Sequence, residues 1–261
     1  MSAPQFIHSR DNAQVKDLRR LAQDSGAYRK QGRIWVEGDH LCRAALARGL
    51  KPALAVFSES FWPVAPVEYA QAASKIIVVG DALMHHIGGL PSPAPLAFVL
   101  DWPAAPALVA DAPTVVLDRV QDAGNVGSIL RSAAAFGFTQ IAAIAGTALL
   151  GSPKVLRAGM GAHFGLRLVE GLAADELAAL RVPLLVTSSH QGQWLHQARL
   201  PWPCAWVLGH EGQGVDAALA ARAALALRIA QPGGEESLNV AAAAAICLHA
   251  SALAAAAPAQ A

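Results

Sequence analysis

Cysteine is scarce in this chain of 261 residues, since only Cys42, Cys204 and Cys247 occur and they lie far apart. No pair has the Cys-x-x-Cys spacing of a zinc ribbon, and an odd number of cysteines does not suit a disulfide framework. The composition is that expected of a reducing, cytoplasmic compartment. His85 and His86 have no cysteine close by in the sequence, and no metal site is predicted.

Long, strongly hydrophobic runs are also missing. The first residues lack the apolar core of a secretory signal peptide. The alanine run from Ala241 is the one candidate for a membrane span, but it contains His249 and Ser251, and alanine is only weakly apolar. A buried, alanine-rich helix is therefore expected, and no membrane association is predicted.

Several common nucleotide and hydrolase fingerprints are absent. The chain has neither the Gly-x-Gly-x-x-Gly turn of dinucleotide-binding domains nor the phosphate-binding loop that ends in Gly-Lys-Ser/Thr. It also lacks the Gly-x-Ser-x-Gly turn that carries the nucleophile of many hydrolases. These absences weigh against an ordinary nucleotide-dependent α/β enzyme and against a hydrolase.

Charge is nearly balanced over the whole chain but not along it. The net charge is +1, yet residues 1–50 contain nine Lys and Arg against five Asp and Glu, so the remaining residues are net acidic. A modest basic patch at the N-terminal end is therefore expected.

The hydrophobic pattern predicts two α/β domains, residues 1–105 and 112–261, joined by a Pro/Ala-rich connection near 103–112. In the first domain, residues 11–23 have helical spacing with a basic outer face. In the second, apolar strands alternate with helices, which is typical of a parallel sheet covered on both faces. The strands expected there are 114–120, 140–146, 183–189, 204–209 and 226–230.

Three glycine-containing turns follow predicted strands of the second domain. They are DRVQDAGNVGSILR (118–131), GHEGQG (209–214) and QPGGEESLN (231–239). In parallel sheets, ligands bind beyond the carboxyl ends of the strands, so the three turns are expected to form one composite pocket. Glycine allows the backbone to approach a ligand closely, and an adenine read by backbone groups would suit such turns.

The polar residues of these turns also have purely structural interpretations. Asn125 is suited to cap the helix that follows, with Gly137 ending it. Arg131 could point to solvent from that helix, as arginine usually does. Ser237 could have no role beyond capping the alanine-rich helix, although helix N-termini also bind ligand groups. Glu211 could be a solvated turn residue, and His210 a local loop residue rather than a base.

The three turns together resemble the motifs of the SpoU/TrmH family of RNA ribose 2′-O-methyltransferases, in the SPOUT superfamily. The motifs occur in the family's order and spacing. Motif 1 corresponds to Asn125, Gly127 and Arg131, motif 2 to Gly209, Glu211, Gly212 and Gly214, and motif 3 to Ile229, Gly233, Ser237, Leu238 and Asn239. One departure is visible in motif 3, where Ala230 and Gln231 replace the usual Pro-Met.

The N-terminal sequence from Ile7 to Leu46 resembles the RNA substrate-binding domain of many family members, a small fold like that of a ribosomal protein. The resemblance implies that RNA phosphates bind its basic residues. The candidates are Lys16, Arg19, Arg20, Arg29, Lys30 and Arg33. A solvated helix face is the simpler interpretation of these residues.

The resemblance implies S-adenosylmethionine as cofactor and a trefoil knot in the second domain. It assigns cofactor contacts to the turns and to the loop after the strand at 183–189, and catalysis to a set centred on Arg131. The implied cofactor residues are Thr187, Ser188, Gly209, Gly214, Ile229, Ser237 and Leu238. The implied catalytic residues are Arg131, Asn125, Glu211, Ser237 and Asn239.

The implied reaction is methylation of a ribose 2′-hydroxyl, with large-subunit (23S) ribosomal RNA favoured by the N-terminal extension. A tRNA methyltransferase is the alternative substrate class, and a non-catalytic RNA-binding protein of the same fold is the alternative function. The family also implies a homodimer, and the helices that follow Asn125 and Asn239 are the expected interface.

Overall fold

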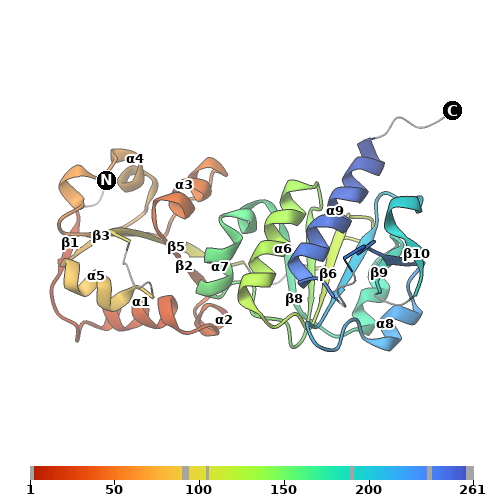
Figure 1. Ribbon diagram of the computed structural model, residues 1–261. Coiled ribbons are helices and arrows are strands. Elements are labelled where there is room, and N and C mark those ends of the chain that lie inside the picture. Colours follow the sequence, from red (N-terminus) through yellow and green to blue (C-terminus); the bar gives the residue numbers. More distant parts are fainter. Residues whose placement is uncertain (1–2, 90–93, 104–105, 189–190, 234–236, 257–261) are drawn as a thin grey trace. The chain divides into compact units, whose positions relative to one another are not determined.

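The computed structural model describes residues 3–89, 94–103, 106–188, 191–233 and 237–256 (Figure 1). The chain divides into two compact units. Unit 1 contains residues 1–104 and 151–164, and unit 2 contains residues 105–150 and 165–261.

Unit 1 has a five-stranded mixed sheet in the order β1-β4-β3-β5-β2. β3 is parallel to β4 and antiparallel to β5, and β2 is antiparallel to β5. The strands are β1 (Gln5–Ile7), β2 (Arg33–Glu37), β3 (Leu54–Ser58), β4 (Ile76–Val79) and β5 (Leu96–Asp101). The helices are α1 (Ala13–Gln23), α2 (Ala27–Gln31), α3 (Asp39–Ala47), η1 (Trp62–Val64), α4 (Val67–Ala72) and α5 (Asp81–Ile87).

Helix α1 confirms the helical spacing of residues 11–23. The Asn12 side chain accepts a hydrogen bond from the backbone amide of Gln14 and so caps the helix. Val15, Leu18 and Leu21 are buried, while the basic residues of the helix are exposed. The apolar stripe packs against α5 and β2, which leaves the charged face in solvent.

Unit 1 also includes a short segment from the second half of the chain. The segment 151–164 carries α7 (Pro153–Gly159) and leads into η2 (Ala162–Gly165), and α7 packs against β2 and α1. Gly151 lies against the ring of Tyr28, because a Cβ at Gly151 would stand 2.6 Å from two ring carbons. The hydrophobic pattern assigns this segment to the domain 112–261, whereas its contacts group it with residues 1–104.

Unit 2 has a seven-stranded sheet in the order β10-β12-β9-β11-β6-β7-β8, and all its pairings are parallel. The strands are β6 (Thr114–Asp118), β7 (Gln140–Ile144), β8 (Arg167–Leu172), β9 (Leu184–Thr187), β10 (Gln193–Trp194), β11 (Ala205–Gly209) and β12 (Leu225–Arg228). The helices are α6 (Ala123–Ala135), η3 (Asp175–Ala179), η4 (Leu195–Gln197), α8 (Ala217–Ala221) and α9 (Val240–Ala256).

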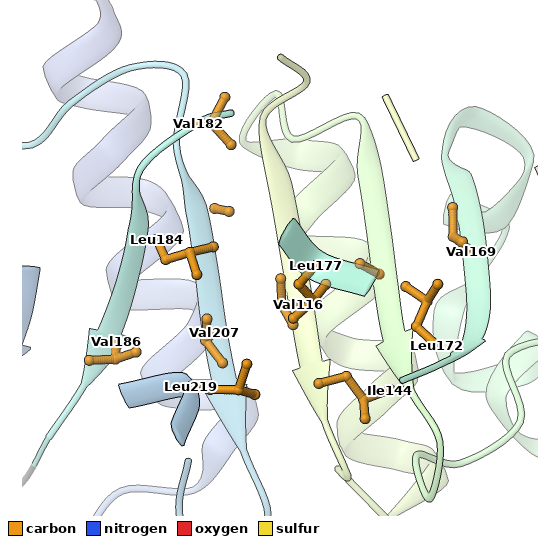
Figure 2. Close-up of a cluster of buried hydrophobic side chains, with 12 residues drawn as sticks. Val116, Ile144, Val169, Leu172, Leu177, Val182, Leu184, Val186, Val207 and Leu219 are labelled. Carbon is orange, nitrogen blue, oxygen red and sulfur yellow. The ribbon is translucent and has the colours of Figure 1, made fainter. Parts of the chain in front are cut away.

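Both faces of this sheet are covered. One face packs Val116, Leu184 and Val207 against Leu177 of η3 and Leu219 of α8 (Figure 2). On the other face α6 and α9 lie side by side, and α9 also packs on β11 (Figure 1). There the buried Trp206 indole donates a hydrogen bond to Ser251 of α9 at 2.8 Å. The alanine-rich stretch is thus a helix of this unit, and α9 buries one face against the sheet.

The predicted α/β class with a parallel sheet is confirmed, and all five strands expected in the second domain are present within a few residues of their predicted limits. The edge strands β8 and β10 were not predicted. The trefoil knot and the likeness of unit 1 to a ribosomal protein stay predictions. Within the described ranges, none of the helices combines the length and apolar character needed to cross a bilayer.

Candidate active site

The turn after β6 starts α6 in a different way from the sequence prediction. Asp122, not Asn125, is the N-cap, because its side chain accepts a hydrogen bond from the Asn125 amide at 2.7 Å. Asn125 therefore lies in the first turn of the helix with its side-chain amide free for other contacts. Gly137 does end the helix, at φ +82°, and the Phe138 amide donates to Ala133 as in a Schellman motif.

Glu211, in the turn after β11, binds the start of α6. Its Oε1 accepts hydrogen bonds from the Asp122 amide and from Asn125 Nδ2, each at 3.1 Å. Its Oε2 accepts from the Gln121 amide at 3.2 Å. The carboxylate is thus placed by motif 1 rather than solvated alone, which excludes the interpretation of Glu211 as a simple turn residue.

The protonation of Glu211 follows from these bonds. Burial alone would raise the pKa of its carboxyl. The hydrogen bonds from Asn125 and from the backbone amides of Glu211, Asp122 and Gln121 outweigh burial and lower the pKa to about 2. The site therefore carries a fixed negative charge at neutral pH.

The turn 209–214 needs glycine at its ends. A Cβ on Gly209 would stand 2.2 Å from the backbone of Gly214 and Val215, and Gly214 has φ +70°. His210 and Gly214 form two backbone hydrogen bonds that close the turn, at 3.0 and 2.8 Å. His210 Nδ1 also accepts from the Gly212 amide, at 2.9 Å. His210 thus shapes its own loop, in agreement with its interpretation as a local loop residue.

Two residues that the sequence pattern did not single out link the first two turns. The buried Asp118 accepts a hydrogen bond from the Asp216 amide at 2.7 Å and forms an ion pair with Arg119 at 2.7 Å. Arg119 also donates to Gln213, on the turn 209–214, at 3.2 Å. Arg119 has φ +60°, an uncommon conformation for a residue with a side chain. The only sequence signal for this link is a charged pair at the end of a buried strand.

The third turn is joined to the first by Asn239. Its Oδ1 accepts from the amides of Ala241 and Ala242 at 2.9 and 3.2 Å, so Asn239 caps α9. The expectation that Ser237 caps this helix is wrong, because the helix begins at Val240. Asn239 Nδ2 donates to Asn125 Oδ1 at 2.9 Å. Asn125 therefore connects motif 2 and motif 3.

A cavity of about 770 Å³ opens between the ends of β9, β11 and β12. The predicted catalytic residues Glu211, Ser237 and Asn239 line it. All of the predicted cofactor residues line it too, and they are Thr187, Ser188, Gly209, Gly214, Ile229, Ser237 and Leu238. His210 and Gln231, from the predicted turns, also line it, whereas the sequence pattern did not single out Val186, Gln191, Leu208, Val215, Ala220, Ala221, Ala226, Val240 and Ala243 as lining residues. Most of these adjoin a motif or a strand end, which was the available signal.

Arg131 does not line this cavity. It is exposed on α6, six residues after Asn125, and it forms no hydrogen bond or ion pair with the residues that the structure describes. Its neighbours on the exposed stripe of the helix are the small residues Gly124, Ser128 and Ala135. Nothing in the described part of the chain therefore occupies the guanidinium.

The six predicted RNA-binding residues lie in unit 1, and all are exposed. Lys16 pairs with Asp11 at 3.3 Å and Arg33 with Asp101 at 3.4 Å, so these two are partly neutralised. Arg19 has a further basic neighbour: burial of His86, together with the positive charges of Arg19 and Arg10, lowers the pKa of that imidazole. Arg10, which is also exposed, thus lies in the neighbourhood of Arg19 and His86. The other exposed candidates are Arg20, Arg29 and Lys30.

Among the described residues, no group of three histidine, cysteine, aspartate or glutamate side chains is placed to hold a metal ion. The ligand cavity lies instead at the carboxyl ends of parallel strands, where α/β proteins bind small molecules. Fold and site together define an α/β protein with a small-molecule pocket and a charged, hydrogen-bonded cluster at its edge.

The chain belongs to the SpoU rRNA Methylase family, whose pattern matches residues 112–249. It is 30% identical over 247 residues to the 23S rRNA (guanosine(2553)-2′-O)-methyltransferase RlmP of Bacillus subtilis, covering 93% of this chain and 97% of the relative. The solved structure of a TrmH-family protein from Porphyromonas gingivalis has a TM-score of 0.79 and 32% identity, covering 92% of this chain and 97% of that one. The AdoMet-bound rRNA methyltransferase of Sinorhizobium meliloti has a TM-score of 0.81 and 25% identity, covering 95% and 97%.

Proposed function

We propose that this protein transfers a methyl group from S-adenosylmethionine to a ribose 2′-hydroxyl of 23S ribosomal RNA. The observation that carries the proposal is the chain of contacts from Glu211 through Asn125 to Asn239, which joins all three motifs at the edge of one cavity. The relative from Bacillus subtilis, which matches this chain over nearly its whole length, is named for this reaction.

The cavity suits the proposed cofactor. Its volume of about 770 Å³ lies within the usual range for small-molecule sites. Apolar side chains such as Leu208, Ile229 and Leu238 can cover a flat base, and Glu211 and Asn239 offer polar groups. Gly209 brings the backbone to the wall with no side chain between. When bound, S-adenosylmethionine supplies a methyl carbon attached to a positively charged sulfur.

The reaction needs alignment and removal of a proton. As the ribose 2′-oxygen forms its bond to the methyl carbon, the carbon–sulfur bond breaks and the hydroxyl proton leaves. Arg131 stays protonated in a protein, so its role is to bind the ribose or an adjacent phosphate and stabilise the developing alkoxide. A phosphate oxygen or a water molecule takes the proton. Asn125, Glu211 and Asn239 hold the motifs in the geometry that the displacement requires, and Ser237, beside Asn239 at the cavity wall, helps to orient the nucleotide.

Unit 1 supplies the RNA-binding surface in this proposal. Its exposed basic residues form a sequence-independent contact with phosphates. Arg10, which like Arg19 places a positive charge near His86, belongs to this proposed surface.

A homodimer completes the proposal. The exposed stripe of α6 carries small residues around Arg131, and the exposed stripe of the adjacent α9 carries Ile246, His249 and Leu253. Small side chains allow a second copy to approach closely, and Ile246 and Leu253 gain from burial, being 41% and 59% exposed. Sedimentation should give a dimer, and Leu253→Asp should give a folded monomer with little activity. A fully active monomer would contradict this arrangement.

The cytoplasm is the proposed location, and the buried free thiols of Cys42, Cys204 and Cys247 suit its reducing conditions.

The decisive test is transfer of labelled methyl groups from S-adenosylmethionine to unmodified total RNA, followed by separation of ribosomal from transfer RNA. Label in the large ribosomal RNA, with one linkage made resistant to alkali, is the expected result. Label in tRNA instead would replace the substrate class and leave the reaction in place. Absence of label from both isolated RNAs and unmodified ribosomal subunits, with the cofactor bound, would favour a binding protein without chemistry.

A further inference from the structure

Gln231 places in the cavity wall a hydrogen-bond acceptor that no described residue satisfies. Its Oε1 is buried and accepts no hydrogen bond within the described part of the chain. A buried carbonyl oxygen without a donor costs free energy, so such groups commonly mark a place where a ligand or water supplies the donor. Of the cavity residues that the structure describes, only Gln231 has a buried polar atom of this kind.

The surroundings of Gln231 indicate which kind of ligand group could donate a hydrogen bond to its Oε1. The cavity residues that flank it along the chain are Ile229 on one side and Ser237 and Leu238 on the other, and none of them is charged. A neutral amide in an uncharged, partly apolar wall suits a flat, uncharged ligand group. A positively charged group would be better placed beside the carboxylate of Glu211, which also lines the cavity.

The carboxamide has the chemistry to recognise adenine. It presents an acceptor and a donor side by side. An adenine edge offers the complementary pair, because the exocyclic amine donates and a neighbouring ring nitrogen accepts. Glutamine pairs with adenine in this way in protein–nucleic acid complexes.

We propose that Gln231 recognises the adenine of the bound cofactor, with Oε1 accepting a hydrogen bond from the exocyclic amine. This inference rests on the proposed cofactor but goes beyond the motif match, because Gln231 is one of the two positions at which the chain departs from motif 3. It makes Gln231 a specificity-determining residue that acts through its side chain.

The test is a double-mutant cycle between protein and ligand. The protein change is Gln231→Met, which keeps length and removes both polar atoms. The ligand change is from S-adenosylhomocysteine to its 6-deamino analogue, in which purine replaces adenine. Dissociation constants are measured by calorimetry for all four pairs, and the melting temperature of each ligand-free protein is recorded.

The expected result has three parts. Gln231→Met binds S-adenosylhomocysteine about tenfold more weakly than the wild type. The wild type discriminates against the deamino analogue more strongly than the variant does. The ligand-free variant melts at or above the wild-type temperature, because an unsatisfied buried acceptor has been removed. Gln71→Met, an exposed substitution on α4, is the matched control and should bind as the wild type does.

Three outcomes would overturn the inference. Equal affinity of wild type and Gln231→Met for S-adenosylhomocysteine would show that the side chain does not contact the ligand. Equal discrimination against the deamino analogue would place the contact elsewhere than at the amine. A lower melting temperature together with equal losses for both ligands would make Gln231 a structural residue of its loop. Failure of the wild type to bind S-adenosylhomocysteine would instead remove the proposed cofactor, and this inference with it.

Discussion

Asn239 donates a hydrogen bond to Asn125 at 2.9 Å, across 114 residues of the chain. The contact fixes the orientation of both amides. Glu211 accepts from Asn125 Nδ2, and an ionised carboxylate can only accept. Asn125 Oδ1 is therefore left to accept from Asn239, whose own Oδ1 caps α9. One side chain in the first turn of α6 thus sets the positions of two distant turns.

Replacing Asn125 tests this connection. Asn125→Ala removes one charge-assisted and one neutral hydrogen bond, so the free energy of unfolding should fall by about 1–2 kcal/mol. Turnover should fall by about 100-fold, because small displacements of aligned groups have effects of that size. Asn12→Ala is the matched control, since it removes the cap of α1 in unit 1 and should reduce stability without a comparable loss of turnover. Equal losses of turnover in the two variants would contradict a specific role for Asn125.

The depressed pKa of Glu211 makes a prediction about acid stability. A carboxyl with a lowered pKa in the folded state stabilises the fold above its usual pKa, here 4.5, and loses that contribution as the pH falls toward 2. Glu211→Gln should therefore be less stable than the wild type at pH 7 and nearly equal to it near pH 2. The residue as a whole is exposed and its carboxyl is only partly buried, which limits the difference at pH 7 to about 1 kcal/mol.

Urea unfolding of both proteins at several pH values measures this difference. Glu68→Gln, which removes an exposed carboxylate of α4, controls for the loss of one surface charge. A gap between wild type and Glu211→Gln that stays constant from pH 7 to pH 2 would contradict the role of the ionised carboxylate.

The interior of the second sheet could be predicted because strands buried on both faces appear as short, continuous apolar runs. The edge strands do not have that pattern. β8 mixes buried with exposed residues, and its register with β7 shifts between Ala143 and Ile144. β10 has only two residues, both exposed. Such a strand depends on backbone pairing with β12, which composition cannot reveal.

The helix caps show why local signals fail at the site. Asp122 and Asn125 are both good capping residues, and the sequence around them does not distinguish their roles. Glu211 distinguishes them, because its carboxylate accepts a hydrogen bond from the Asn125 side chain and Asp122 is left to cap α6. In the same way, Ser237 and Asn239 both suit the start of α9, and the contact with Asn125 accompanies capping by Asn239. In both cases the deciding partner lies far away in the sequence.

Gly209 should tolerate no side chain. In Gly209→Ala the new Cβ would stand 2.2 Å from the carbonyl carbon of Gly214, and backbone atoms cannot move aside cheaply. We expect a loss of about 1–3 kcal/mol in the free energy of unfolding and at least tenfold weaker cofactor binding. Gly80→Ala is the control, because Gly80 has φ −57° and a Cβ there would meet only the end of the Glu59 side chain, at 3.6 Å. Calorimetry on Gly209→Ala that gives wild-type affinity would exclude a role for this turn in the cavity.

If the basic surface of unit 1 binds RNA, the affinity for RNA should fall as the salt concentration rises. Arg19→Ala and Arg20→Ala should each weaken RNA binding and lower the slope of log affinity against log salt by about 1. Arg181→Ala in unit 2 makes the same change in net charge at an arginine already paired with Asp111, and it should leave the slope unchanged. Slopes that are equal for all three variants would place the RNA elsewhere.

Replacing Arg131 should reduce turnover without weakening cofactor binding, because Arg131 is outside the cavity that the predicted cofactor residues line. Arg131→Ala should therefore bind S-adenosylhomocysteine as tightly as the wild type does. Its turnover should fall by about 100- to 1,000-fold, the usual effect of losing one group that stabilises a developing anion. Arg131→Lys keeps the charge but not the planar fork, so it should recover only part of the rate. Single-turnover methyl transfer at saturating cofactor measures the chemical step directly. Near-normal turnover of Arg131→Ala would remove the guanidinium from the mechanism, and weakened cofactor binding would make it a ligand of the pocket instead.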